Sequence, residues 1–297
     1  MWRLLHDESR YTLSGHARTV QSLAVTPDGR YLVSSSEDQT IKIWDLADRH
    51  EIRSIPASYW TYLVVTPDGR RIVAAEGREI KVLDLASGRE LRSFKAHSNS
   101  IYSVLISRDG ASIVTGSADN TIGIWDLDSG RELRRFSAPD RDHLSVTPDG
   151  RYLIAGGSAP TIVVFDLVAG RELHALSGHQ GSIDSIVVTP DGRQIVSASM
   201  DKTIKVWDLA SGSLLHTLSG HGELVGQVAI TPDGRRVISG GTDKTVKIWD
   251  LASGRELRSL SGHWDTITAI AVTPDGRFVI TGSADRTIKF WPLQDPG

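Results

Sequence analysis

His16, Ser34 and Asp38 are, by residue type, the three members of a catalytic triad, and in that role they would carry out hydrolysis. Residues of the same kinds recur with the same spacing in four further places along the chain. An active site is needed once, whereas this set follows a repeat. We therefore interpret the set as part of the framework and expect no enzyme here, since a fold hosts catalysis only where a particular site is built.

Other signals of catalysis or metal binding are absent from the sequence. There is no phosphate-binding loop with a Gly-Lys-Ser/Thr ending, no Gly-x-Gly-x-x-Gly leading from a strand into a helix, and no His-Glu-x-x-His. The chain has 0 cysteines, which excludes disulfides, thiolate zinc sites and a cysteine nucleophile. We expect neither a cofactor nor a metal.

Two repeated charged sets call for an interpretation. Aspartates occupy equivalent turns, where aspartate is favoured locally, so we do not expect them to converge as calcium ligands. They are Asp28, Asp68, Asp149, Asp191, Asp233 and Asp275. An arginine follows the glycine of each Thr-Pro-Asp-Gly turn, and a ring of arginines would suit nucleic acid. The formal net charge is -3, from 33 Lys plus Arg against 36 Asp plus Glu, so we favour a solvated rim and no nucleic-acid partner.

Composition and length set the class. The chain has 297 residues, of which 39% are hydrophobic and 23% charged, enough for a large core and too apolar for wholesale disorder. No uninterrupted apolar run approaches the length of a membrane span, and residues 1–8 lack the apolar stretch of a signal peptide. We expect a cytoplasmic protein with no membrane partner.

The dominant feature of the sequence is an internal repeat of about 40 residues. Its first marker is Thr-Pro-Asp-Gly, which begins at Thr26, Thr66, Thr147, Thr189, Thr231 and Thr273, with Ser107-Arg108-Asp109-Gly110 as a variant. Its second marker is Trp-Asp or a close relative, which ends the third strand of each repeat. Seven repeats fill nearly the whole chain.

Each repeat predicts four short antiparallel strands. In the sixth, the apolar and β-branched runs are Leu224–Ile230, Arg236–Ser239, Thr245–Trp249 and Glu256–Leu260, separated by turn residues. Seven such sheets bury their faces against one another in a ring. The last repeat lacks a fourth strand, so we expect residues 9–13 to supply it and to cover an otherwise open edge.

The motifs resemble those of the WD-repeat β-propeller family over residues 9–293. The residues that carry the resemblance are Gly-His, then Thr-Pro-Asp-Gly, then Ser-x-x-x-Asp-x-Thr-Ile-Lys-x-Trp-Asp, repeated in phase. The repeats are nearly identical to one another in sequence, which is similar to what is seen in bacterial WD-repeat proteins. The resemblance implies an all-β, seven-bladed propeller with residues 1–8 as a linker or N-terminal extension and residues 294–297 as a tail.

The resemblance also implies a buried tetrad in five blades, in which an imidazole, a hydroxyl, a carboxylate and an indole form a hydrogen-bonded network. The tetrads are His16, Ser34, Asp38 and Trp44; His97, Thr115, Asp119 and Trp125; His179, Ser197, Asp201 and Trp207; His221, Ser239, Asp243 and Trp249; and His263, Thr281, Asp285 and Trp291.

Three blades depart from the pattern. Blade two has Ala74 and Leu83 at the hydroxyl and indole positions, and blade four has Ala155 and Phe165. Neither has Gly-His, so the polar groups are lost together. In blade one, Arg49 stands where other blades have a turn glycine, and we expect that turn to have another shape.

Function in this family usually lies on the top face, around the opening of the central channel, which is where we expect a partner. The family's exposed top-face positions lie near the start of each inner strand and just before the tetrad aspartate. In this chain, the large or acidic residues at those positions fall in blades two to five: Tyr59, Tyr102, Asp140, Asp142, Asp184 and Met200. Tyrosine is typical of interface anchors, and clustered carboxylates favour a basic partner.

We therefore expect a non-catalytic scaffold or sensor module that binds a protein or peptide, as in bacterial signalling or regulatory proteins. We expect a monomeric propeller or part of a larger chain. The alternative is a small-molecule hydrolase or isomerase on a propeller scaffold, for which Asp140, Asp142 and His143 are the candidate cluster. A structural spacer without a ligand would present a uniform top face, and the uneven residues argue against it.

Overall fold

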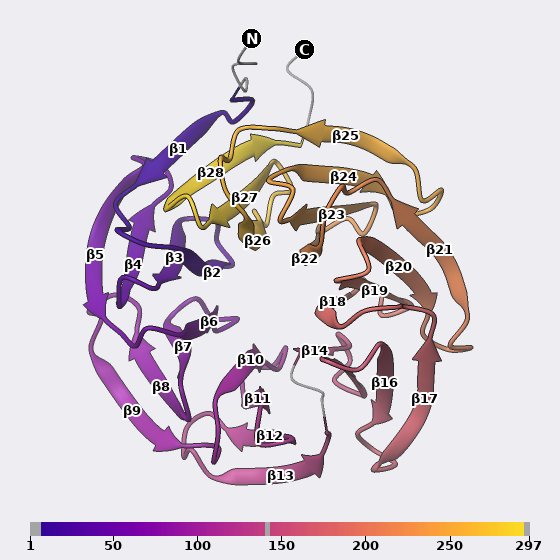
Figure 1. Cartoon of the computed structure of the whole chain (residues 1–297). Coiled ribbons are helices and arrows are strands. Elements are labelled where there is room, and N and C mark those ends of the chain that lie inside the picture. Colours follow the sequence, from indigo (N-terminus) through magenta and orange to yellow (C-terminus); the bar gives the residue numbers. More distant parts are fainter. Residues whose placement is uncertain (1–6, 140–142, 294–297) are drawn as a thin grey trace.

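The computed structural model describes residues 7–139 and 143–293, and everything below concerns these residues. They form strands and turns without a helix. Seven four-stranded antiparallel sheets stand around a central channel as the blades of a closed ring (Figure 1). The predicted all-β, seven-bladed propeller is confirmed.

The strands follow the order expected from the repeats. Blade one contains β2 (Val20–Val25), β3 (Tyr31–Ser36), β4 (Thr40–Asp45) and β5 (His50–Pro56). Blade two contains β6 (Thr61–Val65), β7 (Arg71–Glu76), β8 (Glu79–Asp84) and β9 (Glu90–Lys95). Blade three contains β10 (Ile101–Ile106), β11 (Ser112–Ser117), β12 (Thr121–Asp126) and β13 (Glu132–Ser137). Blade four contains β14 (His143–Val146), β15 (Tyr152–Gly156), β16 (Thr161–Asp166) and β17 (Arg171–Ser177).

The remaining blades complete the circle. Blade five contains β18 (Ile183–Val188), β19 (Gln194–Ser199), β20 (Thr203–Asp208) and β21 (Leu214–Ser219). Blade six contains β22 (Val225–Ile230), β23 (Arg236–Gly241), β24 (Val246–Asp250) and β25 (Glu256–Leu260). Blade seven contains β26 (Ile267–Val272), β27 (Phe278–Ser283), β28 (Thr287–Pro292) and, as its outer strand, β1 (Tyr11–Ser14).

The ring is closed by its own beginning, as predicted. Strand β1 pairs antiparallel with β28, with Tyr11 opposite Phe290, and the two rings stack at 4.2 Å between centroids. The backbone N–H of Glu8 donates to the carbonyl oxygen of Ser261 at 3.0 Å, so the chain joins blade seven before β1 begins. This pairing leaves blade seven without an open outer edge on β28.

The Thr-Pro-Asp-Gly turns fix the register between the first and second strands. In blade one, Thr26 Oγ1 donates to Asp28 Oδ1 at 2.5 Å, and the amide of Arg30 donates to the same oxygen at 3.0 Å. These two hydrogen bonds hold the pKa of Asp28 below its usual value. The turn aspartates are therefore occupied within their own turns.

The core lies between neighbouring blades. One cluster joins Val206 and Leu218 of blade five to Val225, Val237 and Trp249 of blade six, and each is at most 1% exposed. Equivalent clusters join the other blades around the ring, so each sheet buries a face against the next.

On the outer strands of blades one to six, a basic side chain also donates to a carbonyl oxygen of the following blade. Arg53, on β5, donates to the carbonyl oxygen of Ala86 at 2.9 Å. The same bridge is made by Arg92, Arg134, His174, His216 and Arg258 at the matching position of the next five blades. The turn glycine next to Arg53, Gly88, has a φ of +72°, and a Cβ there would lie 2.7 Å from Arg53 Cδ.

The turn at Arg49 corrects a prediction. We expected a different shape there, but Arg49 has a φ of 60° and its amide donates to Asp45 O at 2.8 Å. Gly88 does the same in blade two, with a φ of 72° and a 2.8 Å bond to Asp84 O. The turn shape is therefore kept, and arginine adopts a left-handed conformation that normally favours glycine.

Candidate functional site at the channel mouth

The structure brings the four side chains of each tetrad together. In blade one, His16 Nδ1 lies 2.8 Å from Asp38 Oδ2, His16 Nε2 lies 2.7 Å from Ser34 Oγ, and Trp44 Nε1 donates to Ser34 Oγ at 2.8 Å. The tetrads of blades three, five, six and seven have the same three contacts, all between 2.7 and 2.9 Å.

These networks hold their hydroxyl groups away from solvent. Ser34 is 0% exposed, and because it accepts from Trp44 its own proton is directed to His16. Burial lowers the pKa of His16 and outweighs the opposing effect of Asp38. The hydroxyl cannot meet a substrate in the folded protein, so the tetrad geometry is that of a framework element.

The tetrad carboxylates stay ionised despite their burial. For Asp119, burial raises the pKa, but hydrogen bonds from Thr121 and the Ser98 amide, with the influence of His97, outweigh it and lower the pKa to about 2. The pKa also falls to about 2 for Asp201, Asp243 and Asp285. A satisfied buried network of this kind stabilises a single arrangement of the strands that it joins.

Blade two replaces its missing tetrad with an ion pair. Lys81 Nζ donates to Glu76 Oε2 at 2.8 Å, and Ser58 Oγ donates to the same oxygen at 2.9 Å. The Glu76 side chain is only 4% exposed. This pair was not predicted, because Lys81 stands where other blades also have a lysine, and Glu76 is unremarkable as a strand residue. Blade four instead packs Phe165 against Phe136, with ring centroids 6.1 Å apart.

The innermost strands of the blades with a tetrad differ from those of the two blades without one. Strands β2, β10, β18, β22 and β26, which belong to the blades with tetrads, each carry a bulge near the first residue. Strands β6 and β14 pair without a bulge over their printed registers. The two blades that lack the Gly-His imidazole therefore also present their inner strands in a different way to the channel.

One position on each inner strand faces the channel, and we call these seven residues the channel ring. Each pairs with a serine, alanine or glycine of the second strand. The channel ring consists of Ser22, Tyr62, Ser103, His143, Ser185, Gln227 and Ala269. Its large aromatic members, Tyr62 and His143, come from the two strands without a bulge. The framework repeats, but the channel ring does not.

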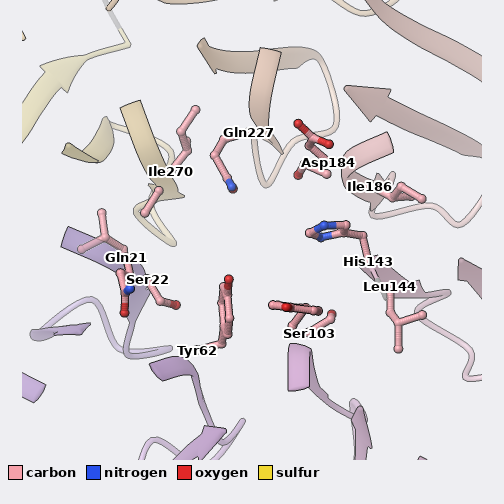
Figure 2. Close-up of a pocket in the computed structure, with 14 residues that line it drawn as sticks. Gln21, Ser22, Tyr62, Ser103, His143, Leu144, Asp184, Ile186, Gln227 and Ile270 are labelled. Atoms are coloured by element: carbon pink, nitrogen blue, oxygen red, sulfur yellow. The ribbon is translucent and has the colours of Figure 1, made fainter. Parts of the chain in front are cut away.

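The channel ring lines a cavity of about 190 Å³, together with Gln21, Tyr102 and Asp184 from the bulges. Figure 2 shows the Tyr62 hydroxyl, the Gln227 amide and the His143 imidazole directed toward the channel from different blades. The rings of Tyr62 and Tyr102 meet edge to face at 6.5 Å between centroids. This concave polar surface can accept hydrogen bonds, donate them and hold one charged group.

The predicted partner residues fall into three groups. Tyr102 and Asp184 line the cavity. Tyr59 and Met200 are exposed, at 40% and 48%, on the loops and turns at the same end of the strands, which we call the top face. Asp140 and Asp142 lie outside the described residues, so only His143 of the alternative catalytic cluster is placed, on the channel ring.

Two exposed tryptophans on the top-face loops were not predicted as partner residues. Trp60 is 53% exposed and packs edge to face against Tyr59, and Trp264 is 57% exposed. The positions used to predict partner residues do not include the residue that follows Gly-His, so they pass over Trp264. An indole where other repeats have Ala17, Ser98 or Gln180 was the signal that could have found Trp264.

Within the described ranges, no three His, Asp or Glu side chains are grouped so as to hold a metal ion. Those ranges also contain no helix that is long and apolar enough to cross a membrane.

Comparison with known proteins agrees with this architecture. A family model described as the WDR3 second beta-propeller domain matches residues 20–295. The chain therefore belongs to the WD-repeat β-propeller family.

The relatives match over part of their length. WD repeat-containing protein 3 of Mus musculus is 32% identical over 38% of this chain and 12% of its own length. An uncharacterized WD repeat-containing protein of Synechocystis is 31% identical over 37% of this chain and 32% of its own. Small ribosomal subunit protein RACK1y of Oryza sativa subsp. japonica is 29% identical over 41% of this chain and 39% of its own. The matched segment thus spans about an eighth of the mouse relative.

Proposed function

We propose that this propeller is a non-catalytic interaction platform that binds a protein or peptide on its top face, around the channel mouth. One observation carries the proposal. The repeat keeps the same four strands in every blade and the tetrad in five, while the channel ring has serine in three blades and a different residue in each of the other four. A purely structural spacer gives no reason for this difference, whereas a binding surface does.

The surface chemistry supports a protein or peptide as the partner. Tyr59, Trp60 and Trp264 are large aromatic side chains that are at least 40% exposed. Exposed aromatic residues of this kind supply the buried anchors of protein interfaces. The carboxylate of Asp184 at the channel gives a preference for a basic partner.

The host protein is also a proposal. The near-identical repeats and the cyanobacterial relative support a bacterial signalling or regulatory protein in the cytoplasm. Because the relatives are matched over a minority of their length, their whole-protein activities do not extend to this chain.

Selection from a random-peptide phage library on the immobilised propeller tests the platform. We expect basic peptides that lose binding to the double variant Tyr102→Ala/Asp184→Ala, whose melting temperature stays close to that of the unmodified protein because Tyr102 is 37% exposed. Leu257→Ser, at an exposed position on the circumference, is the control and should retain binding. Peptides that bind the double variant as tightly as the unmodified protein would place recognition elsewhere and refute the proposal.

A further inference from the structure

We propose that the channel mouth is a socket for one cationic side chain, an arginine or a lysine, of the segment bound on the top face. This inference rests on the proposed function and makes it more specific. It depends on four properties of the cavity: its charge, its aromatic rings, an unpaired buried amide and its size.

The charge of the lining selects a cation. Asp184 is the one acidic residue among those that line the cavity, and no lysine or arginine of the described chain lines it. Asp184 projects from the bulge of β18, where Ser182 Oγ donates to its Oδ1 at 3.1 Å. A carboxylate in a partly enclosed site forms stronger hydrogen bonds with a charged donor than with a neutral one.

The aromatic rings favour the same ligand. Tyr62 and Tyr102 pack edge to face at 79° to each other, so together they form one aromatic wall of the cavity. A guanidinium or ammonium group is attracted to the face of a tyrosine ring. The hydroxyl of Tyr62 is directed toward the channel and provides an oxygen acceptor for a remaining N–H group (Figure 2).

An unpaired amide marks the opposite side of the channel. Gln21 is 9% exposed, and its Oε1 accepts from the backbone N–H of Thr61 at 3.2 Å. Its Nε2 is a buried donor without a hydrogen-bond partner among the described residues. Leaving such a donor unpaired is unfavourable, so a bound acceptor would stabilise it. A main-chain carbonyl next to the inserted side chain is such an acceptor.

The size of the cavity limits the ligand. A volume of about 190 Å³ accommodates one side chain with its main-chain carbonyl and is smaller than the pockets that hold drug-sized molecules. Gln21 belongs to blade one and Asp184 to blade five, so they face the cavity from opposite sides of the ring (Figure 2). A residue with a carbonyl at one end and a cation at the other matches this arrangement.

Saturation-transfer NMR with N-acetyl-arginine methylamide tests the socket. We expect binding with a dissociation constant on the order of 1 mM, as for one small ligand with few contacts. The neutral isostere N-acetyl-citrulline methylamide should bind about tenfold more weakly, since it loses the charged hydrogen bond. N-acetyl-lysine methylamide, which keeps the free side-chain amine, should bind in the range of the arginine probe.

Three variants separate the socket from non-specific attraction. Asp184→Asn should weaken binding of the arginine probe to the level of the citrulline probe. Gln21→Leu removes the amide donor that meets the main-chain carbonyl of the ligand, so it should weaken binding of the arginine and citrulline probes alike, several-fold. Glu223→Gln removes an exposed charge from the loop before β22 and should change nothing.

Equal binding of the arginine and citrulline probes would overturn the socket. So would unchanged binding to Asp184→Asn, or the absence of saturation transfer from both cationic probes. If the probes fail while selected peptides still depend on Tyr102 and Asp184, the socket is refuted and the platform stands. If the probes bind as expected but the peptides ignore those residues, the platform is refuted and a small cation site remains.

Discussion

The guanidinium of Arg49 lies 4.2 Å from the centroid of the Tyr11 ring, across the junction where the propeller closes. By strand register, Tyr11 occupies the place of Arg53 and its counterparts, the basic residues that bridge to the next blade elsewhere. At the closing junction the aromatic ring of Tyr11 on the outer strand meets the cation of Arg49 in the turn, whereas in the other blades a basic side chain on the outer strand donates to a backbone carbonyl oxygen. Arg49 has a positive φ, so the attraction between its guanidinium and the Tyr11 ring opposes the backbone strain at that position.

Replacement of Arg49 by glycine should therefore have two opposing effects. Glycine relieves the left-handed strain, which costs roughly 1 kcal/mol, but it removes a cation–π contact worth roughly 0.5–1 kcal/mol. We expect little net change in the free energy of unfolding. In the Tyr11→Leu background the same replacement should stabilise the protein, because only the strain remains.

A double-mutant cycle with urea unfolding measures this coupling between Arg49 and Tyr11. Tyr59→Ala, at an exposed aromatic residue away from the junction, serves as the control and should leave the unfolding free energy almost unchanged. A coupling energy of zero would show that the ring does not compensate for the turn.

Removal of one tetrad hydroxyl should destabilise the propeller. Ser239→Ala leaves the indole N–H of Trp249 and Nε2 of His221 without their shared partner inside a buried site. The expected cost is about 2 kcal/mol, the usual penalty for buried unpaired polar groups. Thermal unfolding measures it, and Ser213→Ala, on an exposed turn, is the matched control. A melting temperature equal to that of the control would contradict a stabilising role.

The ion pair in blade two predicts an asymmetry between single and double variants. Glu76→Gln leaves Lys81 without its carboxylate, so we expect a loss of about 3 kcal/mol at this largely buried site. The double variant Glu76→Met/Lys81→Met replaces both groups with apolar side chains and should recover much of that loss. Chemical denaturation of the two variants compares them. An equal or larger loss in the double variant would refute the prediction.

The tetrads also predict the direction of the pH dependence. Burial lowers the pKa of His16, His97 and His179 below the usual 6.5, so the unfolded chain takes up protons before the folded one does. Stability should fall as the pH drops below about 6.5. It should fall again below 3.8, because the pKa of Asp119, Asp201, Asp243 and Asp285 is about 2 in the folded protein.

Urea unfolding between pH 8 and pH 3 follows this dependence. The account requires an unfolding free energy that is level above neutrality and declines on the acid side. A free energy that increased between pH 7 and pH 5 would mean that the buried imidazoles are charged in the folded state.

The sequence predicted the features that depend on neighbours along the chain. The turn at Thr26–Gly29 and its copies contain their own hydrogen-bond partners, so their spacing was enough to identify the strands and the closed ring. Closure by residues near Tyr11 was also predictable, because blade seven ends without an outer strand. Tyr102 and Asp184 were predicted as partner residues, and the structure places both on the channel cavity.

Features that depend on contacts between distant residues were not predictable in this way. Arg49 meets Tyr11 across the closing junction, and Glu76 accepts from Ser58 of the preceding loop, so both contacts join separate parts of the chain. The unpaired amide of Gln21 depends on the bulge in β2 and on the Thr61 backbone of the next blade.

The most direct test of the account is to locate a selected peptide on the propeller by cross-saturation NMR. The account predicts that saturation reaches the inner-strand amides around Tyr62, Tyr102 and Asp184, and that purified protein turns over no substrate there. Saturation confined to the outer strands β5, β9 and β13 would contradict recognition at the channel mouth. Reproducible turnover abolished by a change at His143 would contradict the assignment as a non-catalytic platform.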